Sequence, residues 1–432
     1  MRKLSSFLIA LAAAALLAVP AQAAQFHRLY SFCGDNCGLT GGDPDGGLVA
    51  DAAGNLYGAT SIDGVHGRGT VFELSPRGAT GKYTFRTLYH FCARVSCTDG
   101  ARPEGALVID TAGNLYGTTQ QGGAAAEGTA FRLSPIPDTH KFTYSVLYDF
   151  CSRDSSCPDG IGPMAGLSYA GQLSGLPYDG ISPLYGVAGS GGRYAGGTVF
   201  SLNRRSNDTW FARTLYAFCA IPDCSDGRLP SAVIADALGN LYGTTRISVD
   251  FASGVAFKLV KGTKECCWNE TVLHSFCSGC SGGYAPQGLT MDGAGNLFGT
   301  TLSGGVVNSA CQSSTCGVAY RIAPDTTFTV LHEFCTVGDC FDGANPSGPL
   351  LLDSSGNLFG TAQKLGRYNG GTLFEIASGG GVATLHAFCR EAQCADGQAP
   401  MGALATDPSG ALYGVANRGG DRTFGSVWKV TP

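Results

Sequence analysis

The fold is decided by a short stretch, Asn114-Leu115-Tyr116-Gly117-Thr118-Thr119, because close copies of it recur along the chain. The tripeptide Leu-(Tyr/Phe)-Gly occurs seven times, at spacings of 59, 69, 57, 56, 61 and 54 residues. The copies begin at Leu56, Leu115, Leu184, Leu241, Leu297, Leu358 and Leu412. A second motif, Leu-(Tyr/His)-x-Phe-Cys, also occurs seven times, at Leu29, Leu88, Leu147, Leu215, Leu273, Leu331 and Leu385. Two motifs with one period indicate tandem structural units.

Each unit contains four short strand patterns separated by turn residues, as the second unit shows at residues 106–110, 114–118, 128–133 and 144–150. The first turn reads Asp110-Thr111-Ala112-Gly113, in which Asp can cap its own turn and Gly accepts a positive φ. No stretch beyond residue 23 has sustained helical periodicity. Seven four-stranded units predict an all-β fold, a seven-bladed β-propeller with four antiparallel strands per blade.

The two ends of the repeat region complement each other. The first copy of the Leu-(Tyr/His)-x-Phe-Cys motif, at residues 29–33, has the pattern of a fourth strand and precedes any first strand. Residues 425–430 have the pattern of a third strand, and no fourth strand follows it. We therefore expect the N-terminal strand to complete the last blade and close the ring, which leaves no unpaired edge. This predicts a single propeller domain over residues 24–432.

The N-terminus has the pattern of a secretory signal peptide over residues 1–23. Arg2 and Lys3 precede an apolar run at residues 7–19, and Ala21-Gln22-Ala23 is a small-x-small cleavage site. Thirteen apolar residues are too few for a membrane span of about 20. We expect cleavage after Ala23 and a chain without a membrane span, exported to the periplasm or the extracellular space.

Composition excludes several classes of protein. The chain of 432 residues has 28 Lys+Arg against 33 Asp+Glu, only 14% charged residues, 65 Gly and 44% hydrophobic residues. A large core can therefore form, and disorder is not expected. Mild acidity with no basic stripe argues against a nucleic-acid partner.

The repeat resembles a known one. The pattern is carried by Asp99-Gly100, Pro103, Leu107, residues 113–119, Gly122-Gly123 and residues 128–133. It is similar to the GloVer tandem repeat of exported bacterial "choice-of-anchor" proteins, and the match extends over essentially the whole chain after residue 25. The resemblance implies the propeller and export, and it supplies no catalytic residue. This chain departs from the pattern at residues 171–182, where an insertion replaces the Gly-Asn pair, and it has no recognisable C-terminal anchor.

The 18 cysteines predict local disulfides, because their number is even, they pair off closely and the compartment is oxidising. The expected pairs are Cys33/Cys37, Cys92/Cys97, Cys151/Cys157, Cys219/Cys224, Cys277/Cys280, Cys311/Cys316, Cys335/Cys340, Cys389/Cys394 and a vicinal pair of Cys266 with Cys267. Only Cys277/Cys280 has zinc-like spacing, which is weak support for a metal site. A vicinal disulfide occurs at some quinone-dependent propeller sites, but a rigid hairpin is the simpler interpretation.

The candidate binding residues lie in the Gly-rich loops between the second and third strands. Arg and Tyr there suit recognition of a carbohydrate or a protein surface, because the Arg guanidinium can donate two parallel hydrogen bonds and the Tyr side chain offers a rigid ring for stacking. Covering neighbouring loops is the alternative role for these side chains. The candidates are Arg68, Arg193, Tyr194, Arg367, Tyr368 and Arg422.

A set of Asp residues before Gly should lie on the same face. As a ring they could bind calcium or supply acid and base groups, but Asp-Gly is also a common start of a tight turn, which is the interpretation we favour. The set is Asp45, Asp99, Asp159, Asp226, Asp342 and Asp396, with Ser281-Gly282 in place of the motif in blade five. His274, His332 and His386 occupy the slot that Tyr fills elsewhere, so they indicate drift within the repeat.

The sequence favours a binding or interaction module over an enzyme, since it offers no coherent catalytic set, no metal-ligand set and no cofactor motif, apart from the calcium alternative. The expected partner is a carbohydrate or a cell-surface protein. The alternatives are a secreted or periplasmic enzyme acting on polysaccharide, a quinone-type oxidoreductase, and a purely structural envelope protein. The ligand and the oligomeric state cannot be read from the sequence.

Overall fold

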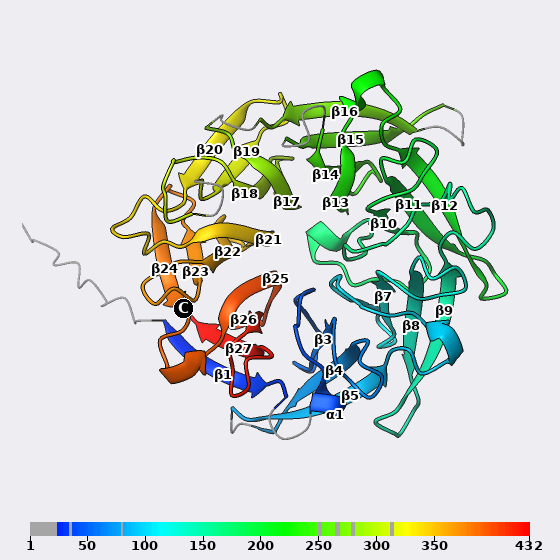
Figure 1. Ribbon diagram of the computed structural model, residues 1–432, viewed down its shortest axis with the longest axis horizontal. Coiled ribbons are helices and arrows are strands. Elements are labelled where there is room, and N and C mark those ends of the chain that lie inside the picture. The colour runs from blue at the N-terminus through cyan, green and yellow to red at the C-terminus, as the bar shows by residue number, and fades with distance from the viewer. Residues whose placement is uncertain are drawn as a thin grey trace, which may run out of the picture.

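The computed structural model describes residues 24–33, 37–78, 81–248, 253–263, 268–277, 281–311 and 315–432. Their strands form seven antiparallel sheets arranged as blades around a ring (Figure 1). The predicted all-β, seven-bladed propeller is therefore confirmed. The predicted signal peptide, residues 1–23, lies outside the described residues. No helix in the described ranges is long and apolar enough to cross a membrane.

The blades follow one another along the chain, each from its inner to its outer strand. Blade one contains β2 (Leu48–Ala50), β3 (Leu56–Thr60), β4 (Thr70–Pro76) and β5 (Tyr83–His90). Blade two contains β6 (Val108–Ile109), β7 (Leu115–Thr119), β8 (Thr129–Pro135) and β9 (Phe142–Asp149). Blade three contains β10 (Leu184–Ala188), β11 (Thr198–Arg204) and β12 (Trp210–Ala217). Blade four contains β13 (Arg228–Ala235), β14 (Leu241–Ile247), β15 (Val255–Lys261) and β16 (Trp268–Ser275).

Blade five contains β17 (Tyr284–Met291), β18 (Leu297–Ser303), β19 (Val318–Ile322) and β20 (Phe328–Glu333). Blade six contains β21 (Ala344–Leu352), β22 (Leu358–Lys364), β23 (Thr372–Ile376) and β24 (Val382–Ala387). Blade seven contains β25 (Gln398–Thr406), β26 (Leu412–Arg418), β27 (Ser426–Thr431) and β1 (Gln25–Ser31). The short helices are α1 (Cys37–Thr40), η2 (Val95–Cys97), η3 (Gln172–Ser174), η4 (Pro222–Cys224) and η6 (Ala392–Cys394).

The recurring Leu-(Tyr/Phe)-Gly motif is explained by one packing contact in each blade. In blade two Gly117 of β7 lies opposite Phe131 of β8. A Cβ on Gly117 would come within 2.7 Å of the Phe131 ring, so only glycine lets that buried ring lie across the strand. The same glycine–ring pair occurs in each of the other blades, at Gly58/Phe72, Gly186/Phe200, Gly243/Phe257, Gly299/Tyr320, Gly360/Phe374 and Gly414/Trp428.

The Asp-x-x-Gly turn forms as predicted. In blade two the carboxylate of Asp110 accepts the backbone N–H groups of Ala112 and Asn114, both within 2.9 Å. The hydroxyl of Tyr116 donates to the same carboxylate at 2.9 Å. The Tyr of the motif therefore ties the turn to the core beside the glycine contact.

The ring closes as predicted, because β1 pairs antiparallel with β27 from Gln25↔Thr431 to Ser31↔Ser426. The N-terminal strand is thus the outer strand of blade seven (Figure 1). Blade three departs from the others at its inner position, where an isolated bridge, Ser168↔Tyr185, replaces the first strand. The inserted residues 171–182 fold back there, and the buried ring of Tyr178 packs edge-on against Tyr116 of blade two.

Six of the predicted disulfides are present within the described residues: Cys92–Cys97, Cys151–Cys157, Cys219–Cys224, Cys311–Cys316, Cys335–Cys340 and Cys389–Cys394. Cys33 and Cys277 are disulfide-bonded as well. Most of these bonds tighten the link between the outer strand of one blade and the inner strand of the next, which we call the connection loop.

The remaining cysteine predictions fall on parts of the chain that the structure does not describe. Cys266 and Cys267, predicted to form a vicinal disulfide between β15 and β16, both lie outside the described residues. Cys280, the predicted partner of Cys277, also lies outside them. The vicinal bond between Cys266 and Cys267 is therefore not among the six disulfides above and stays a prediction.

Candidate functional site

Five of the predicted Asp carboxylates are bound inside their own connection loops. Asp99 is buried and accepts hydrogen bonds from the hydroxyl of Tyr89 at 2.7 Å and from the N–H groups of Ala93 and Arg94 at 2.9 and 3.1 Å. Comparable bonds hold Asp159, Asp226, Asp342 and Asp396. Each carboxylate lies in a separate blade junction. The geometry therefore fits the turn interpretation better than a ring of ligands.

Asp45 does not belong to this set, and grouping it there was wrong. Pro44 corresponds to Pro103, so Asp45 is the counterpart of Glu104, and Thr40 stands where Asp99 stands in the next loop. The Thr40 hydroxyl accepts the N–H of Cys33 at 3.1 Å. The first loop has a different length, and its Asp-Gly pair, Asp45-Gly46, follows the proline instead of preceding it, so the dipeptide alone gave the wrong register.

Asp45 is part of a charged cluster where inner strands begin, toward the centre of the ring. Glu104 forms a 3.0 Å salt bridge with Arg102, and Asn417 donates to Asp45. Burial raises the pKa of Glu104 and the charge of Asp45 raises it further, against the lowering effect of Arg102; burial also raises the pKa of Asp45. The charge of Glu104 favours the protonated guanidinium of Arg246, from blade four. Burial outweighs this attraction and lowers the pKa of Arg246. The Arg246 side chain is nevertheless exposed to solvent.

Arg68 lines a cavity of about 460 Å³ between blades two and three. The neighbouring lining residues are mostly polar or small, and they include Gln120, Gln121, Glu127 and Met164. No aromatic ring lines this cavity among the described residues. It can hydrogen-bond a polar ligand but offers no ring on which a sugar could stack.

Arg367 and Tyr368 line a larger cavity of about 710 Å³ between blades six and seven, which we call the blade-six groove. Tyr368 is 39% exposed and Phe341, on the same wall, is 44% exposed. The guanidinium of Arg367 lies over the Tyr368 ring at 5.8 Å. Arg390 and Glu391 of the next connection loop add further polar groups. Exposed rings and planar polar groups thus face one cavity.

Two buried lining residues of the blade-six groove, His386 and Asp396, form a hydrogen-bonded pair. His386 Nε2 lies 3.1 Å from Asp396 Oδ2, and the Phe26 ring stacks on the imidazole with centroids 3.9 Å apart. Burial opposes ionisation of Asp396, but His386 and the N–H groups of Glu391 and Arg390 outweigh it and hold the pKa below its usual range. His386 is therefore a hydrogen-bonding counterpart of Tyr89 and not mere drift; His332 plays the same role for Asp342 at 2.9 Å.

The other predicted binding residues stand apart from this groove. Arg193 and Tyr194 form a similar pair in blade three, with 5.6 Å between the guanidinium and the ring centroid, and Arg422 is exposed in blade seven. The six candidates therefore do not assemble into one site. Four lining residues of the blade-six groove were not predicted from the sequence: Phe26, Phe341, Arg390 and Glu391. A position-by-position comparison of the seven repeats marks them as departures from the repeat.

A family model described as the Gloeobacter/Verrucomicrobia repeat matches residues 14–182 and 271–432. No curated protein matches the sequence.

Several solved structures match the chain at low identity. A luciferin-regenerating enzyme has a TM-score of 0.45 and 10% identity over 95% of both chains. A puromycin hydrolase S511A mutant has a TM-score of 0.47 and 12% identity, over 87% of this chain and 50% of its own. PorZ, a surface component of the type-IX secretion system of Porphyromonas gingivalis, has a TM-score of 0.43 and 12% identity, over 83% of this chain and 43% of its own. Identities this low transfer no activity.

Proposed function

Because the chain belongs to the Gloeobacter/Verrucomicrobia repeat family, with motif and signal peptide patterns typical of export, we propose that it is an exported binding module. Its ligand is a carbohydrate, bound in the blade-six groove. The six disulfides support an oxidising compartment, since such bonds are rare in the cytosol. The periplasm and the extracellular space both meet this requirement.

One observation carries the choice of ligand: Tyr368 and Phe341 expose their rings on the wall of one polar cavity. A sugar has an apolar face of C–H groups and an edge of hydroxyls. An exposed ring packs against that face, while Arg367, Arg390 and Glu391 can hydrogen-bond the edge. A protein partner would more often meet a flat patch with fully buried anchors than a cavity.

The charges of the groove favour an acidic sugar. Within the described ranges neither Arg367 nor Arg390 forms a salt bridge, and Glu391 is the one exposed carboxylate on the lining. Ala24 also lines the groove, so cleavage after Ala23 would place a new α-ammonium at its edge. A uronate-containing glycan would pair its carboxylate with these cations.

The test is a glycan array on oxidised residues 24–432, followed by calorimetry with the best ligand. Tyr368→Ala should weaken binding about tenfold, the equivalent of about 1.4 kcal/mol. Tyr194→Ala is the matched control, because Tyr194 has the same motif and similar exposure outside the groove; it should change affinity less than about twofold. Equal losses in both variants would refute the site. Absence of binding to any glycan on the array would favour a structural role or a protein partner.

A polysaccharide hydrolase is the second candidate, favoured by the cluster near the centre of the ring. Burial raises the pKa values of the two carboxyl groups, Asp45 and Glu104, and the charge of Asp45 raises that of Glu104 further, as a pair of acid and base groups requires. This candidate predicts release of reducing ends from an acidic or neutral polysaccharide, abolished in Glu104→Gln. Absence of hydrolysis in the wild type across such substrates would exclude it.

A further inference from the structure

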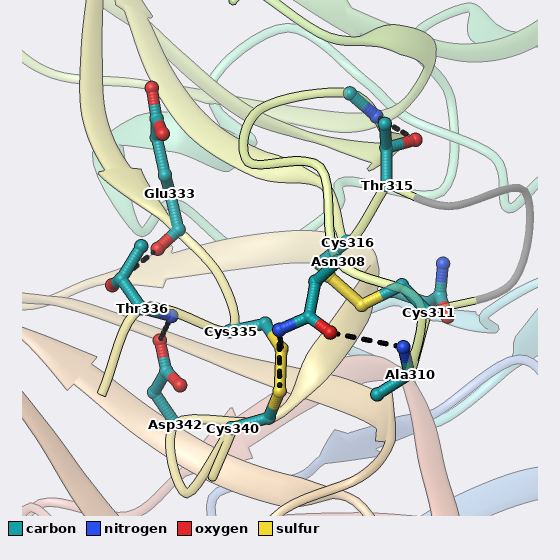
Figure 2. The surroundings of a disulfide bond; sticks show 12 residues. Asn308, Ala310, Cys311, Thr315, Cys316, Glu333, Cys335, Thr336, Cys340 and Asp342 are labelled. Carbon is teal, nitrogen blue, oxygen red and sulfur yellow. Dashed lines mark hydrogen bonds between the residues drawn. A yellow bond between two sulfur atoms is a disulfide. The ribbon is translucent and has the colours of Figure 1, made fainter. Parts of the chain in front are cut away.

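Blade five carries two disulfides side by side, whereas blades one, two, three and six each carry one within the described residues, in the connection loop that follows the blade. Cys311–Cys316 lies in the loop between β18 and β19, and Cys335–Cys340 lies in the connection loop that follows β20 (Figure 2). The Sγ atoms of Cys311, Cys316 and Cys335 all lie within 4.8 Å of one another. Nowhere else in the described chain do three such sulfur atoms gather. One disulfide is therefore within close reach of the other.

Asn308 lies between the two disulfides and is oriented toward one of them (Figure 2). Its Nδ2 donates to Cys335 Sγ at 3.0 Å and to Cys340 Sγ at 3.5 Å. Its Oδ1 accepts the N–H of Ala310 at 3.0 Å, which fixes the direction of the amide. An N–H donor at a sulfur stabilises the thiolate that forms when the bond breaks, and Asn308 Nδ2 is within reach of both sulfur atoms of this bond, so a thiolate released at Cys340 has a donor beside it.

The surroundings favour exchange inside the protein over exchange with solvent. All four cysteines are buried, and among them Cys311 is the most exposed, at 7%, while Cys316 is fully covered. A small thiol can therefore meet Cys311 first. A thiolate released at Cys316 has Cys335 Sγ as its near neighbour and little access to water.

We propose that the two blade-five disulfides form a thiol–disulfide exchange site for a small dithiol. The dithiol thiolate attacks Cys311 Sγ, forms a mixed disulfide and releases the Cys316 thiolate. Cys316 attacks Cys335 Sγ, forms the Cys316–Cys335 bond and releases the Cys340 thiolate beside Asn308. The second thiol of the dithiol then displaces Cys311. Two electrons pass to the protein, which ends with one disulfide and thiols at Cys311 and Cys340, while the dithiol becomes a cyclic disulfide.

The product joins two loops that the oxidised protein keeps separate. The Cys316–Cys335 bond ties the loop after β18 to the connection loop after β20, and it frees Cys340. Phe341, the next residue, lines the blade-six groove. Exchange therefore alters one wall of that groove, a consequence that rests on the proposed function, whereas the chemistry itself does not depend on it.

Partial reduction of the native protein tests the proposal without any variant. Oxidised residues 24–432 are treated with limiting dithiothreitol, quenched in acid, alkylated with N-ethylmaleimide and mapped by mass spectrometry. We expect a Cys316–Cys335 cross-link with alkylated Cys311 and Cys340. The isolated Cys389–Cys394 bond is the internal control and should yield two alkylated partners and no cross-link.

Asn308→Ala should slow formation of the cross-link about fivefold and leave reduction of Cys389–Cys394 unchanged, since a lost hydrogen bond of about 1 kcal/mol corresponds to that factor. Two results would overturn the proposal. One is independent opening of the two blade-five disulfides, with both partners alkylated and no cross-link. The other is resistance of both at a dithiol concentration that opens Cys389–Cys394.

Discussion

Two loops of this molecule share one motif and differ in what surrounds them. Gly-Arg-Tyr occurs in blade three at Arg193-Tyr194 and in blade six at Arg367-Tyr368. In both the guanidinium lies over the ring, at 5.6 and 5.8 Å, and the rings are 44% and 39% exposed. Of the two cavities described above, one is lined by the blade-six pair and neither is lined by the blade-three pair. The motif alone therefore does not make a site.

The difference comes from three other segments at matching repeat positions. The wall residue is Phe341 in the blade-six groove and Pro158 beside blade three. The next connection loop contributes Arg390-Glu391 in one place and Ala220-Ile221 in the other. The neighbouring outer strand contributes Phe26 in one and Glu270 in the other. Two rings and two charged side chains beside blade six thus correspond to small, apolar or acidic residues beside blade three.

The largest contrast is expected from the two buried Asp residues. Asp396 accepts bonds from His386, Arg390 and Glu391 on both carboxylate oxygens, whereas Asp226 Oδ1 has no hydrogen-bond partner within the described residues. Asp396→Ala leaves the buried His386 side chain and two part-buried N–H groups without their acceptor and should cost about 3 kcal/mol of unfolding free energy. Asp226→Ala should cost about 1 kcal/mol, because its loss also relieves repulsion of a neighbouring carboxyl.

Urea unfolding with the disulfides intact measures both variants. The ranking is the decisive result: equal losses, or a larger loss for Asp226→Ala, would contradict this difference between the two junctions.

A pH effect of intermediate size should come from Glu270. Burial, followed by the charge of Asp226, raises its pKa to about 7. The unfolded chain releases this proton near the ordinary pKa of about 4.5, so stability falls as the pH rises from about 4.5 to 7 and then levels off. Glu270→Gln should remove about 2 kcal/mol of this fall, a figure reduced for solvent screening.

Thermal melts of the wild type and Glu270→Gln at pH 5 and pH 8 provide the comparison. The variant should gain most at pH 8. An identical pH profile in the two proteins would show that Glu270 does not titrate in this window.

The smallest effect is expected at the groove wall. Phe341→Ala removes a partly exposed ring and should weaken glycan binding about fivefold, or about 1 kcal/mol. Pro158→Ala is the matched change beside blade three and should leave affinity unchanged. Calorimetry with the array-selected glycan measures both, and equal losses would place the ligand elsewhere.

The fold could be predicted because its physical causes are local. Gly117 and Phe131 are a cross-strand pair within one hairpin, and Asp110 caps a turn beside it. The contacts that determine the fold of a blade therefore lie within a single repeat. The groove could be predicted only in part. Arg367 and Tyr368 are visible in the loop, but Phe26 reaches them from the opposite end of the chain through ring closure.

The misassignment of Asp45 has a different cause. Its loop has a different length between the second cysteine and Pro44, and the Asp45-Gly46 dipeptide follows that proline, whereas Asp99-Gly100 precedes Pro103. Repeat-by-repeat alignment on the prolines would have corrected it.

The most direct test of the central claim is a crystal structure of oxidised residues 24–432 with the glycan selected on the array. The account predicts a sugar ring against Tyr368 or Phe341, with its polar edge at Arg367 and Arg390. A glycan found in the Arg68 cavity, beside Asp45 and Glu104, or against Tyr194, with the blade-six groove empty, would contradict it.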